Sequence, residues 1–295
     1  MPRCAFLSIE DLSKYVCDDE LVIKYLQENG WDIETIPWRK KEVDWLAFDL
    51  VVVRSTWDYQ SAPKAFFEAL QQIKKTGVPL LNSLALVAWN LEKTYLRDIE
   101  KAGFDIVPTL WSKSPLQKAQ LLQAFSTFST AELILKPIVS ANADHTYRLV
   151  PEDVNSLWPV LAEAYRSRPF MIQPFISQII TEGEFSLFFF GGEYSHSMLK
   201  RPRSGDFRVQ EEHGGHISAC DPPPELLQES ICLVSQLPDI PFQARVDWVR
   251  QSPEKNQFMV MELELIEPSL YFRFAPHAVV NFKTALERHL TQTRL

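Results

Sequence analysis

The first 82 residues alternate short apolar runs with helix-like segments, and this alternation restricts the possible folds more than any other feature. The segments "DDELVIKYLQENG" (18–30) and "APKAFFEALQQIKKTG" (62–77) have helical periodicity, and each ends at a glycine. Strand-like runs occupy residues 4–8, 31–37, 49–55 and 78–82. Such strands, separated by helices, are typical of a parallel sheet with crossover helices. We therefore predict a small α/β lobe over residues 1–84.

The pattern of the chain changes near residue 170. Before that point, helix-like segments at 88–103, 114–125 and 151–167 alternate with strand-like segments at 105–111 and 131–137. After it, long runs at 170–176, 184–200, 242–250 and 257–266 indicate antiparallel strands joined by turns such as Gly191-Gly192. We predict an α+β region made of two further parts, residues 85–172 and 173–295.

Composition and charge limit the possible partners and compartment. The net charge of −8 argues against a nucleic-acid binder with a broad basic surface. Nowhere do eighteen apolar residues run together, and the N-terminal apolar stretch is short, so we expect a cytoplasmic protein with no membrane partner. The four cysteines have no CxxC spacing and fit reduced structural thiols.

Three acidic side chains are candidate ligands of a cation. Glu262 and Glu264 alternate with apolar residues in "MELELIEPSL", so in a strand they share one face. Asp247 lies in the preceding strand, "ARVDWVR", which we expect to pair with it as a hairpin. Carboxylates placed in this way suit Mg²⁺ with a nucleotide, although a solvated face on which glutamates meet lysines is an equal alternative.

Two isolated lysines add to this pattern. Lys136 ends the apolar strand "LILKP", and Lys93 lies near the start of a helix, where a cation opposes the helix dipole. Lysines can pair with polyphosphate, so together with a Mg²⁺ site they indicate a nucleotide clamp. The sequence contains neither GxxxxGK[ST] nor GxGxxG, so it supports neither a P-loop nor a dinucleotide fold.

The order of motifs resembles the ATP-grasp superfamily of carboxylate–amine ligases. The motifs are a first lysine, "LILKP", "MIQPFI", "EGEFSLFFFGG", "KRPRSGDFRVQEEHGG", "ARVDWV" and "MELELIEPSL". "VVRSTWDY", "KRPRSGDFRVQ" and "ELELIEPSL" most resemble the branch that contains the O-ureidoserine cyclo-ligase of cycloserine biosynthesis. Glutathione synthetase and ribosomal-protein glutamate ligase are more distantly similar. The resemblance covers residues 85–295 and implies an ATP-grasp fold preceded by an α/β (pre-ATP-grasp) lobe.

The resemblance also implies roles for individual residues. Lys93 and Lys136 match the lysines that hold ATP phosphates, and Glu184 matches the acidic residue on the ribose hydroxyls. Asp247, Glu262 and Glu264 match the magnesium ligands. The hinge beside adenine corresponds to Gln173, Pro174, Phe175 and Ile176. The cations that steady the transferring phosphate correspond to Arg208 with Lys200 or Arg201, and Gly214 and Gly215 would let backbone N–H groups approach that anion.

The chain departs from the family pattern at three places. The phosphate-covering loop, usually rich in glycine, reads "IVSANADHT" (138–146) and contains none. Gln173 stands where many members carry Glu, and Glu264 stands where most carry Asn; both keep an acceptor oxygen.

Further candidates lie outside these motifs. Arg54, Trp57 and Asp58 follow an apolar strand at the edge where ligands bind to open parallel sheets, so they are candidate substrate contacts, with a structural turn as the alternative. Glu267 is a further candidate substrate contact. The pair His213 and His216 looks metal-like, but we interpret it as part of a substrate loop.

We therefore predict an ATP- and Mg²⁺-dependent ligase, for which Mn²⁺ could also serve. A substrate carboxylate becomes an acyl phosphate that an amine nitrogen attacks, either within one amino-acid-like molecule or between two. No nucleophilic side chain is needed, because catalysis is positioning plus charge neutralisation. The alternatives are an ATP-binding module without catalysis and a metal-dependent phosphohydrolase. The partners are small carboxylates and amines, and a homodimer is compatible with the sequence.

Overall fold

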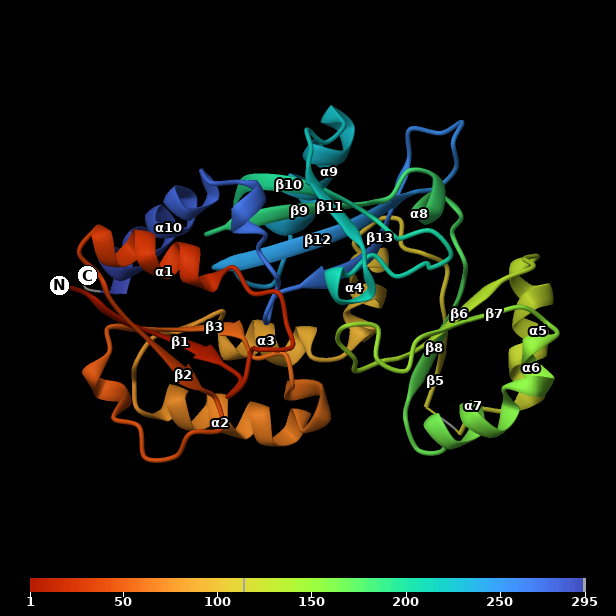
Figure 1. The fold of residues 1–295 in the computed structure, drawn as a ribbon, viewed down its shortest axis with the longest axis horizontal. Helices are drawn as coiled ribbons and strands as arrows, with labels where there is room; N and C mark the ends of the chain where they lie inside the picture. Colours follow the sequence, from red (N-terminus) through yellow and green to blue (C-terminus); the bar gives the residue numbers. More distant parts are fainter. Residues whose placement is uncertain (114, 294–295) are drawn as a thin grey trace.

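The computed structural model describes residues 1–113 and 115–293, and contains three sheets (Figure 1). The N-terminal sheet has the order β2-β1-β3-β4 and is entirely parallel, as predicted. Its strands are β1 (Arg3–Ser8), β2 (Asp32–Pro37), β3 (Leu50–Ser55) and β4 (Leu80–Leu81). Its helices are α1 (Asp19–Glu28) and α2 (Pro63–Lys75).

The two faces of this sheet belong to different cores. Cys4 and Phe6 of β1 pack with α1, whereas Ala5 and Leu7 pack with α2. Successive side chains of a strand point to opposite faces, so an apolar run such as "CAFL" satisfies both cores at once. The α1 core continues into α10 (Ala278–Thr293), and it joins the first lobe to the C-terminal part of the chain (Figure 1).

The second sheet is antiparallel, with the order β5-β8-β6-β7. Its strands are β5 (Leu110–Ser112), β6 (Leu133–Pro137), β7 (Tyr147–Leu149) and β8 (Phe170–Pro174). The helices that share its core are α5 (Lys118–Phe128), α6 (Asp153–Ser156) and α7 (Trp158–Ala164). They form the small lobe at the right of Figure 1.

The third sheet has the order β11-β10-β9-β12-β13 and is antiparallel, as predicted. Its strands are β9 (Glu184–Phe190), β10 (Glu193–Arg201), β11 (His216–Ala219), β12 (Gln243–Arg250) and β13 (Phe258–Glu264). Helix α9 (Pro224–Ser235) packs on one face and α10 on the other, while α8 (Gln178–Thr181) precedes β9. Short 3-10 turns occur at Trp45–Ala47, Tyr59–Ser61, Lys93–Tyr95, Glu211–His213 and Phe272–Phe274.

The single helix predicted over 88–103 is wrong. The chain instead forms α3 (Leu84–Asn90), the 3-10 turn at Lys93–Tyr95 and α4 (Leu96–Lys101). Asn90 donates from Nδ2 to the carbonyl of Leu263 at 2.8 Å and accepts from the amide of Leu265 at 2.9 Å. These bonds to the end of β13 outweigh the local helical preference and end the helix before Lys93.

Three other predicted elements differ in extent. Of the strand predicted over 105–111 only β5 forms, together with an isolated bridge from Ile106 to Val260, because Pro108 has no N–H to donate. The helix predicted over 151–167 is divided at Leu157 into α6 and α7, because Pro159 in the first turn of α7 has no N–H to continue the helix from α6. The helix predicted from residue 114 begins at Lys118, and residue 114 itself lies outside the described residues.

The division of the chain at residues 84 and 172 remains a prediction; β8 runs across the second boundary. All four cysteines are free. Within the described residues, no helix is long and apolar enough to cross a bilayer.

Candidate active site

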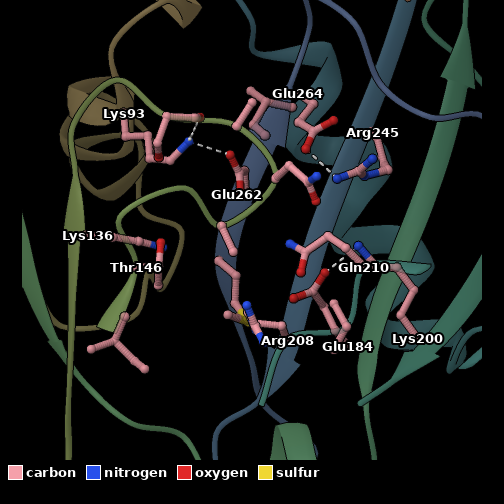
Figure 2. Close-up of a pocket in the computed structure, with 18 of the residues that line it drawn as sticks. Lys93, Lys136, Thr146, Glu184, Lys200, Arg208, Gln210, Arg245, Glu262 and Glu264 are labelled. Atoms are coloured by element: carbon pink, nitrogen blue, oxygen red, sulfur yellow. Dashed lines mark hydrogen bonds and ion pairs between the residues drawn. The ribbon is translucent and has the colours of Figure 1, made fainter. Parts of the chain in front are cut away.

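A large cavity lies where the three sheets meet, and residues from each part of the chain line it. The N-terminal lobe contributes Trp57, the middle part contributes Lys93 and Lys136, and the third sheet contributes Glu262 and Glu264. Figure 2 shows the two lysines across the cavity from side chains of the third sheet. The cavity brings together most of the residues that the sequence singles out.

Lys93 and Lys136 form one wall of the cavity, and both are buried. Lys93 donates from Nζ to Glu262 Oε1 at 2.6 Å and to the carbonyl of Ser140 at 3.0 Å. Burial lowers the pKa of Lys136; Lys93 acts in the same direction and Glu262 opposes it. A buried cation without a close carboxylate of its own favours an anion in front of it.

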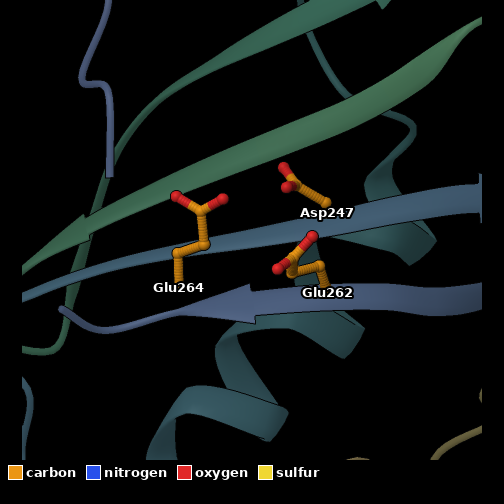
Figure 3. A group of neighbouring side chains, drawn as sticks. All are labelled: Asp247, Glu262 and Glu264. Atoms are coloured by element: carbon orange, nitrogen blue, oxygen red, sulfur yellow. The ribbon is translucent and has the colours of Figure 1, made fainter. Parts of the chain in front are cut away.

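The three acidic candidates lie on two neighbouring strands (Figure 3). Asp247 of β12 pairs directly with Glu262 of β13, as the predicted hairpin requires, and Glu264 follows two residues later on the same strand. One carboxylate oxygen from each of the three lies within 4.8 Å of the others. No other group of three or more potential metal ligands lies this close together in residues 1–113 and 115–293. The side chains of Glu262 and Glu264 are 28% and 24% exposed, so they do not form the solvated face considered above.

A cation opposes each of these carboxylates. Arg245 forms an ion pair with Glu264 and, through Nη2 at 2.9 Å, with Asp247. Burial raises the pKa of Glu264 to about 7, with Glu262 and Asp247 adding to the rise and Arg245 opposing it. The pKa of Glu262, in contrast, lies below its usual value. Burial alone would raise it, but the charges of Lys93 and Lys136 outweigh that effect. Because carboxylates crowded in this way repel one another, the group fits a divalent cation.

Asp247 differs from the two glutamates because both of its oxygens are already occupied. Its carboxylate accepts bonds from Arg245 at 2.9–3.1 Å, from Lys200 Nζ at 3.3 Å and from the Ser186 hydroxyl. These cations outweigh burial and lower the pKa of Asp247 to about 2. Asp247 therefore anchors Arg245 and Lys200 beside the cavity, in addition to offering one oxygen to the metal group.

Glu184 forms an ion pair with Lys200, which lies directly opposite it on β10. The Nζ–Oε1 distance is 2.5 Å and both side chains are buried. The turn before β9 makes this pairing possible. Gly183 has φ +118°, and a Cβ there would lie 2.7 Å from the Lys200 carbonyl, so only glycine fits. Glu184 and Lys200 both line the cavity.

The predicted hinge borders an apolar corner of the cavity. Gln173, Pro174, Phe175 and Ile176 all line it. This corner is also lined by apolar side chains of a single cluster, on which Ile176 packs. They are Val107, Ile179, Val209 and Met261. The Arg148 guanidinium lies 3.9 Å from the centre of the Phe175 ring. A flat aromatic ligand such as a purine fits a corner of this composition.

In the basic loop, the structure places Arg208 in the cavity wall but not Arg201, Gly214 or Gly215. Asp206 orients Arg208 through two bonds, Nε–Oδ1 at 3.0 Å and Nη2–Oδ2 at 2.7 Å. The hydrogen bonds from the Arg208 side chain are the main reason why the pKa of Asp206 is lowered.

The other predicted residues of this loop have structural contacts. Arg201 donates instead to the carbonyl of Glu182 at 2.9 Å. The backbone at Gly215 lies so close to Val209 that a Cβ on residue 215 would be 2.0 Å from the Val209 carbonyl oxygen. Glycine is therefore needed there for the two backbone segments to pack against each other. His213 contacts the carbonyl of Asn142 at 3.3 Å, and neither it nor His216 belongs to a metal group within the described residues.

The glycine-free loop after β6 adopts the backbone that glycine would favour. Asn142, Ala143 and His145 have φ of +50°, +56° and +50°. Left-handed geometry costs a residue with a Cβ about 1–2 kcal/mol, although asparagine tolerates it better. Five residues of this loop line the cavity together with Lys136: Ser140, Ala141, Asn142, Ala143 and Thr146. The loop therefore has the position and the shape of a phosphate cover despite its composition.

Replacing Ala143 with glycine is expected to raise the free energy of unfolding by about 0.5–1 kcal/mol, because the relief of left-handed strain exceeds the added freedom of the unfolded chain. Ala141 is the matched control, since it lies in the same loop without a positive φ. Ala141→Gly should lower the free energy of unfolding by about 0.4–1 kcal/mol. Urea unfolding of both variants tests this; a less stable Ala143→Gly variant would contradict it.

Of the candidates Arg54, Trp57 and Asp58, at and after the end of β3, only Trp57 lines the main cavity. Arg54 is 1% exposed and is bonded to Asp19 Oδ1 at 2.6 Å and to Gln243 Oε1 at 2.7 Å. Asp58 accepts from Trp38 Nε1 at 2.6 Å and forms an ion pair with Arg39 at 3.1 Å. For Arg54 and Asp58 the structure favours the alternative of a structural turn: Arg54 connects β3 to α1 and β12.

The end of the cavity near Trp57 is aromatic and acidic. Tyr15 packs its ring against Trp57, and the Glu267 carbonyl accepts from Trp57 Nε1 at 2.8 Å; the cavity is also lined by Tyr59, Gln210, Glu212, Ser269 and Tyr271. Of these, only Trp57 and Glu267 were singled out from the sequence. Arg245 and Asp206 were also missed, although Arg245 is two residues before Asp247 and so had to share its strand face.

Comparison with known proteins shows which sequences and folds this chain is similar to. Residues 4–82 match a family model described as the N-terminal domain of D-cycloserine synthetase DcsG. The cycloserine biosynthesis protein DcsG of Streptomyces lavendulae is 28% identical over 285 residues, covering 88% of this chain and 90% of that protein.

Solved structures show the same fold. The crystal structure of D-cycloserine synthetase DcsG has a TM-score of 0.85 at 23% identity and covers 98% of this chain and 99% of that one. The ATP-grasp ligase PsnB, complexed with a minimal precursor, Mg and ADP, has a TM-score of 0.63 at 12% identity, over 96% and 97% of the two chains. The predicted ATP-grasp fold is confirmed. The resemblance to ATP-grasp ligase enzymes, and among them to the cycloserine-synthesis branch, is confirmed with it.

Proposed function

We propose that this protein is an ATP- and Mg²⁺-dependent ligase that activates a carboxylate for attack by an amine. A carboxylate oxygen attacks the γ-phosphorus of ATP, the bond to ADP breaks, and an acyl phosphate forms. An amine nitrogen then attacks the acyl carbon, loses a proton, and inorganic phosphate leaves. The observation that supports this most is the pairing of Lys93 and Lys136 with the Asp247–Glu262–Glu264 group across one cavity.

The residues of the cavity divide this work. The apolar corner at Val107, Ile176 and Met261 would receive adenine, and the lysine wall would hold the phosphates. Glu262 and Glu264, with Asp247, would hold Mg²⁺, which when bound neutralises charge on the phosphates. Arg208 and Lys200 would hold the anionic transferring group.

Trapping with hydroxylamine tests the proposal even while the natural amine is unidentified. Hydroxylamine attacks an acyl phosphate and gives a hydroxamate and phosphate, both of which can be measured. With ATP, Mg²⁺ and a panel of small carboxylic acids, we expect ADP and hydroxamate in equal amounts for the acids that are substrates. ATP hydrolysis without hydroxamate would instead favour a phosphohydrolase, and ATP binding without ADP release would favour a binding module.

Lys136→Met is expected to raise the Kd for Mg-ATP about tenfold or more, because a charge-assisted contact to phosphate is worth about 1.5–3 kcal/mol. The fold should be preserved, since the substitution removes a buried charge that lacks a close carboxylate. Lys64→Met is the control. The Lys64 side chain is 91% exposed, and Lys64 lies on α2 and does not line the cavity. Calorimetric titration showing the same affinity in all three proteins would exclude this role.

A further inference from the structure

Three carbonyl groups of the chain beyond β13 accept hydrogen bonds from side chains of other elements. The carbonyl of Glu267 accepts from Trp57 Nε1 at 2.8 Å, that of Pro268 from Arg54 Nη1 at 3.4 Å, and that of Leu270 from His196 Nε2 at 2.9 Å. His196 lies on β10 and does not itself line the cavity. It therefore influences the cavity only through the residues that it touches.

Tyr271 is the residue of this segment that most needs such support. Its φ of +50° lies in the left-handed region, which is unfavourable for a residue with a Cβ. Its side chain is buried and lines the cavity, yet its hydroxyl makes no hydrogen bond with any residue in 1–113 or 115–293. Because a buried hydroxyl normally has a partner, we expect a ligand in the cavity to supply one.

The charges near Tyr271 indicate which kind of ligand group this is. Burial raises the pKa of Tyr271 to about 12, and Lys200 and Arg245 are the charges that most oppose the rise. Both cations lie on the third-sheet side of the cavity (Figure 2). The hydroxyl therefore keeps its proton near two cations, a setting in which it donates best to an anionic oxygen.

The partners of His196 fix the direction of its hydrogen bonds. A carbonyl only accepts, so Nε2 donates to Leu270, and Nδ1 of the neutral ring accepts from the Ser195 hydroxyl at 3.0 Å. The Ser195 oxygen accepts in turn from Asn281 Nδ2 at 3.0 Å. Burial lowers the pKa of His196 to about 4; the bond to Leu270 opposes this effect, and His277 adds to it. The ring is therefore neutral at neutral pH, and Nε2 remains a donor.

The ring of His196 also supports Tyr271 by packing. It is 4% exposed and stacks on Phe188, with the ring centroids 4.3 Å apart and an angle of 5° between the planes. The Tyr271 ring meets Phe188 edge to face, with a centroid distance of 6.0 Å. His196 thus reaches Tyr271 through the Leu270 carbonyl and through Phe188. Because these two routes use different atoms of His196, substitutions can separate them.

We propose that His196 is a positioning residue of the ligase reaction, an inference that rests on the proposed function. Its hydrogen bond to the Leu270 carbonyl holds Tyr271 in the left-handed conformation, and the Tyr271 hydroxyl then donates to an anionic oxygen of the transferring phosphoryl group. The hydroxyl keeps its proton throughout, so no covalent bond to the protein forms or breaks. Displacing such a donor slows the reaction more than it weakens binding.

Two substitutions of His196 separate the hydrogen bond from the packing. His196→Gln keeps an N–H of similar reach for the Leu270 carbonyl but loses the stacked ring, whereas His196→Phe keeps a ring and loses the N–H. The readout is ADP formation with a carboxylate found in the hydroxylamine assay. We expect kcat to fall about tenfold to a hundredfold in His196→Phe and to stay within about threefold in His196→Gln. The Kd for Mg-ATP should change by about threefold or less in both.

Phe6→Leu is the matched control for lost packing. Phe6 is 1% exposed, belongs to the same apolar core as Phe188 and does not line the cavity. We expect the melting temperature of this variant to fall, as it should in His196→Phe, while kcat stays within about threefold of the unchanged protein. An equal fall of kcat in both variants would assign the effect to stability and overturn the proposal.

Tyr271→Phe tests the group through which His196 acts. It removes only the hydroxyl and should lower kcat about tenfold or more, with a change of about threefold or less in the Kd for Mg-ATP. The double variant His196→Phe/Tyr271→Phe should have the kcat of Tyr271→Phe alone, because there is then no hydroxyl left to position. Losses that multiply in the double variant would overturn the proposal. So would a His196→Gln variant as slow as His196→Phe, or a His196→Phe variant as fast as the unchanged protein.

A binding measurement separates this inference from the proposed ligase function. If no carboxylate leads to ADP release, the ligase proposal fails, and the role of His196 is decided with Mg-ADP and aluminium fluoride, which mimics a phosphoryl group in transfer. We expect His196→Phe and Tyr271→Phe to bind this complex about tenfold more weakly, and His196→Gln to bind it as the unchanged protein does. Equal affinity in all four proteins, or no binding by the unchanged protein, would overturn the positioning role.

Discussion

Replacing Arg208 with alanine is expected to lower kcat by about 100-fold or more while changing the Kd for ATP by about threefold or less. Arg208 lies in the cavity wall and is oriented by Asp206 through two bonds. Its charge counts most when negative charge develops on the transferring phosphate, so its loss should affect the transition state more than bound ATP.

Single-turnover ADP formation and equilibrium ATP titration together measure this separation. Arg203→Ala is the matched control, because it removes a cation from the same loop, its side chain is 61% exposed, and it does not line the cavity. We expect that variant to remain within about threefold of the unchanged protein, since exposed charges contribute about 0–1 kcal/mol. Equal losses of kcat and of ATP affinity in Arg208→Ala would place Arg208 among ordinary ground-state contacts.

Glu262→Gln is the second substitution with a large expected effect. Removing one of three carboxylates from a hard-cation site should raise the Mg²⁺ concentration needed for half-maximal activity by about tenfold or more. It also replaces the ion pair of Lys93, whose Nζ lies 2.6 Å from Glu262 Oε1, with a weaker hydrogen bond to a neutral amide. Glu264→Gln should be milder. The amide keeps an oxygen donor of the same reach, and Glu264 is the carboxyl whose pKa is already raised to about 7.

Measuring ADP formation across a Mg²⁺ titration for both variants tests this order. The two curves should shift to higher Mg²⁺, with that of Glu262→Gln shifted further. If both curves coincide with that of the unchanged protein, these glutamates do not bind the metal, and the carboxylate group serves only to hold Arg245 and Lys93 in place.

Elements with a clear repeat could be predicted from the sequence, because their signal is local. The parallel sheet of the first lobe follows from apolar runs that satisfy two cores, and the β12–β13 hairpin follows from the alternation in "MELELI". Arg245 could also have been found by this reasoning, since it shares a strand face with Asp247. The ion pair between Glu184 and Lys200 could not, because it depends on the register of β9 against β10.

Other features depend on contacts between distant parts of the chain. The break after α3 arises from hydrogen bonds of Asn90 to the end of β13, which no local propensity encodes. The left-handed residues of the loop after β6 contradict the preference of alanine, and the structure holds Ala143 there against it. Arg54 has the place of a substrate contact in an open sheet, yet its bonds to Asp19 and Gln243 make it a link between lobes.

The transfer of carboxylate oxygen to phosphate tests the central claim most directly. A carboxylic acid identified in the hydroxylamine panel is labelled with ¹⁸O in its carboxylate and incubated with ATP, Mg²⁺ and an amine. If an acyl phosphate forms, the inorganic phosphate released carries one ¹⁸O atom from the substrate. Phosphate without label from the labelled acid, and with label when the water carries ¹⁸O instead, would show hydrolysis of ATP and contradict the ligase mechanism.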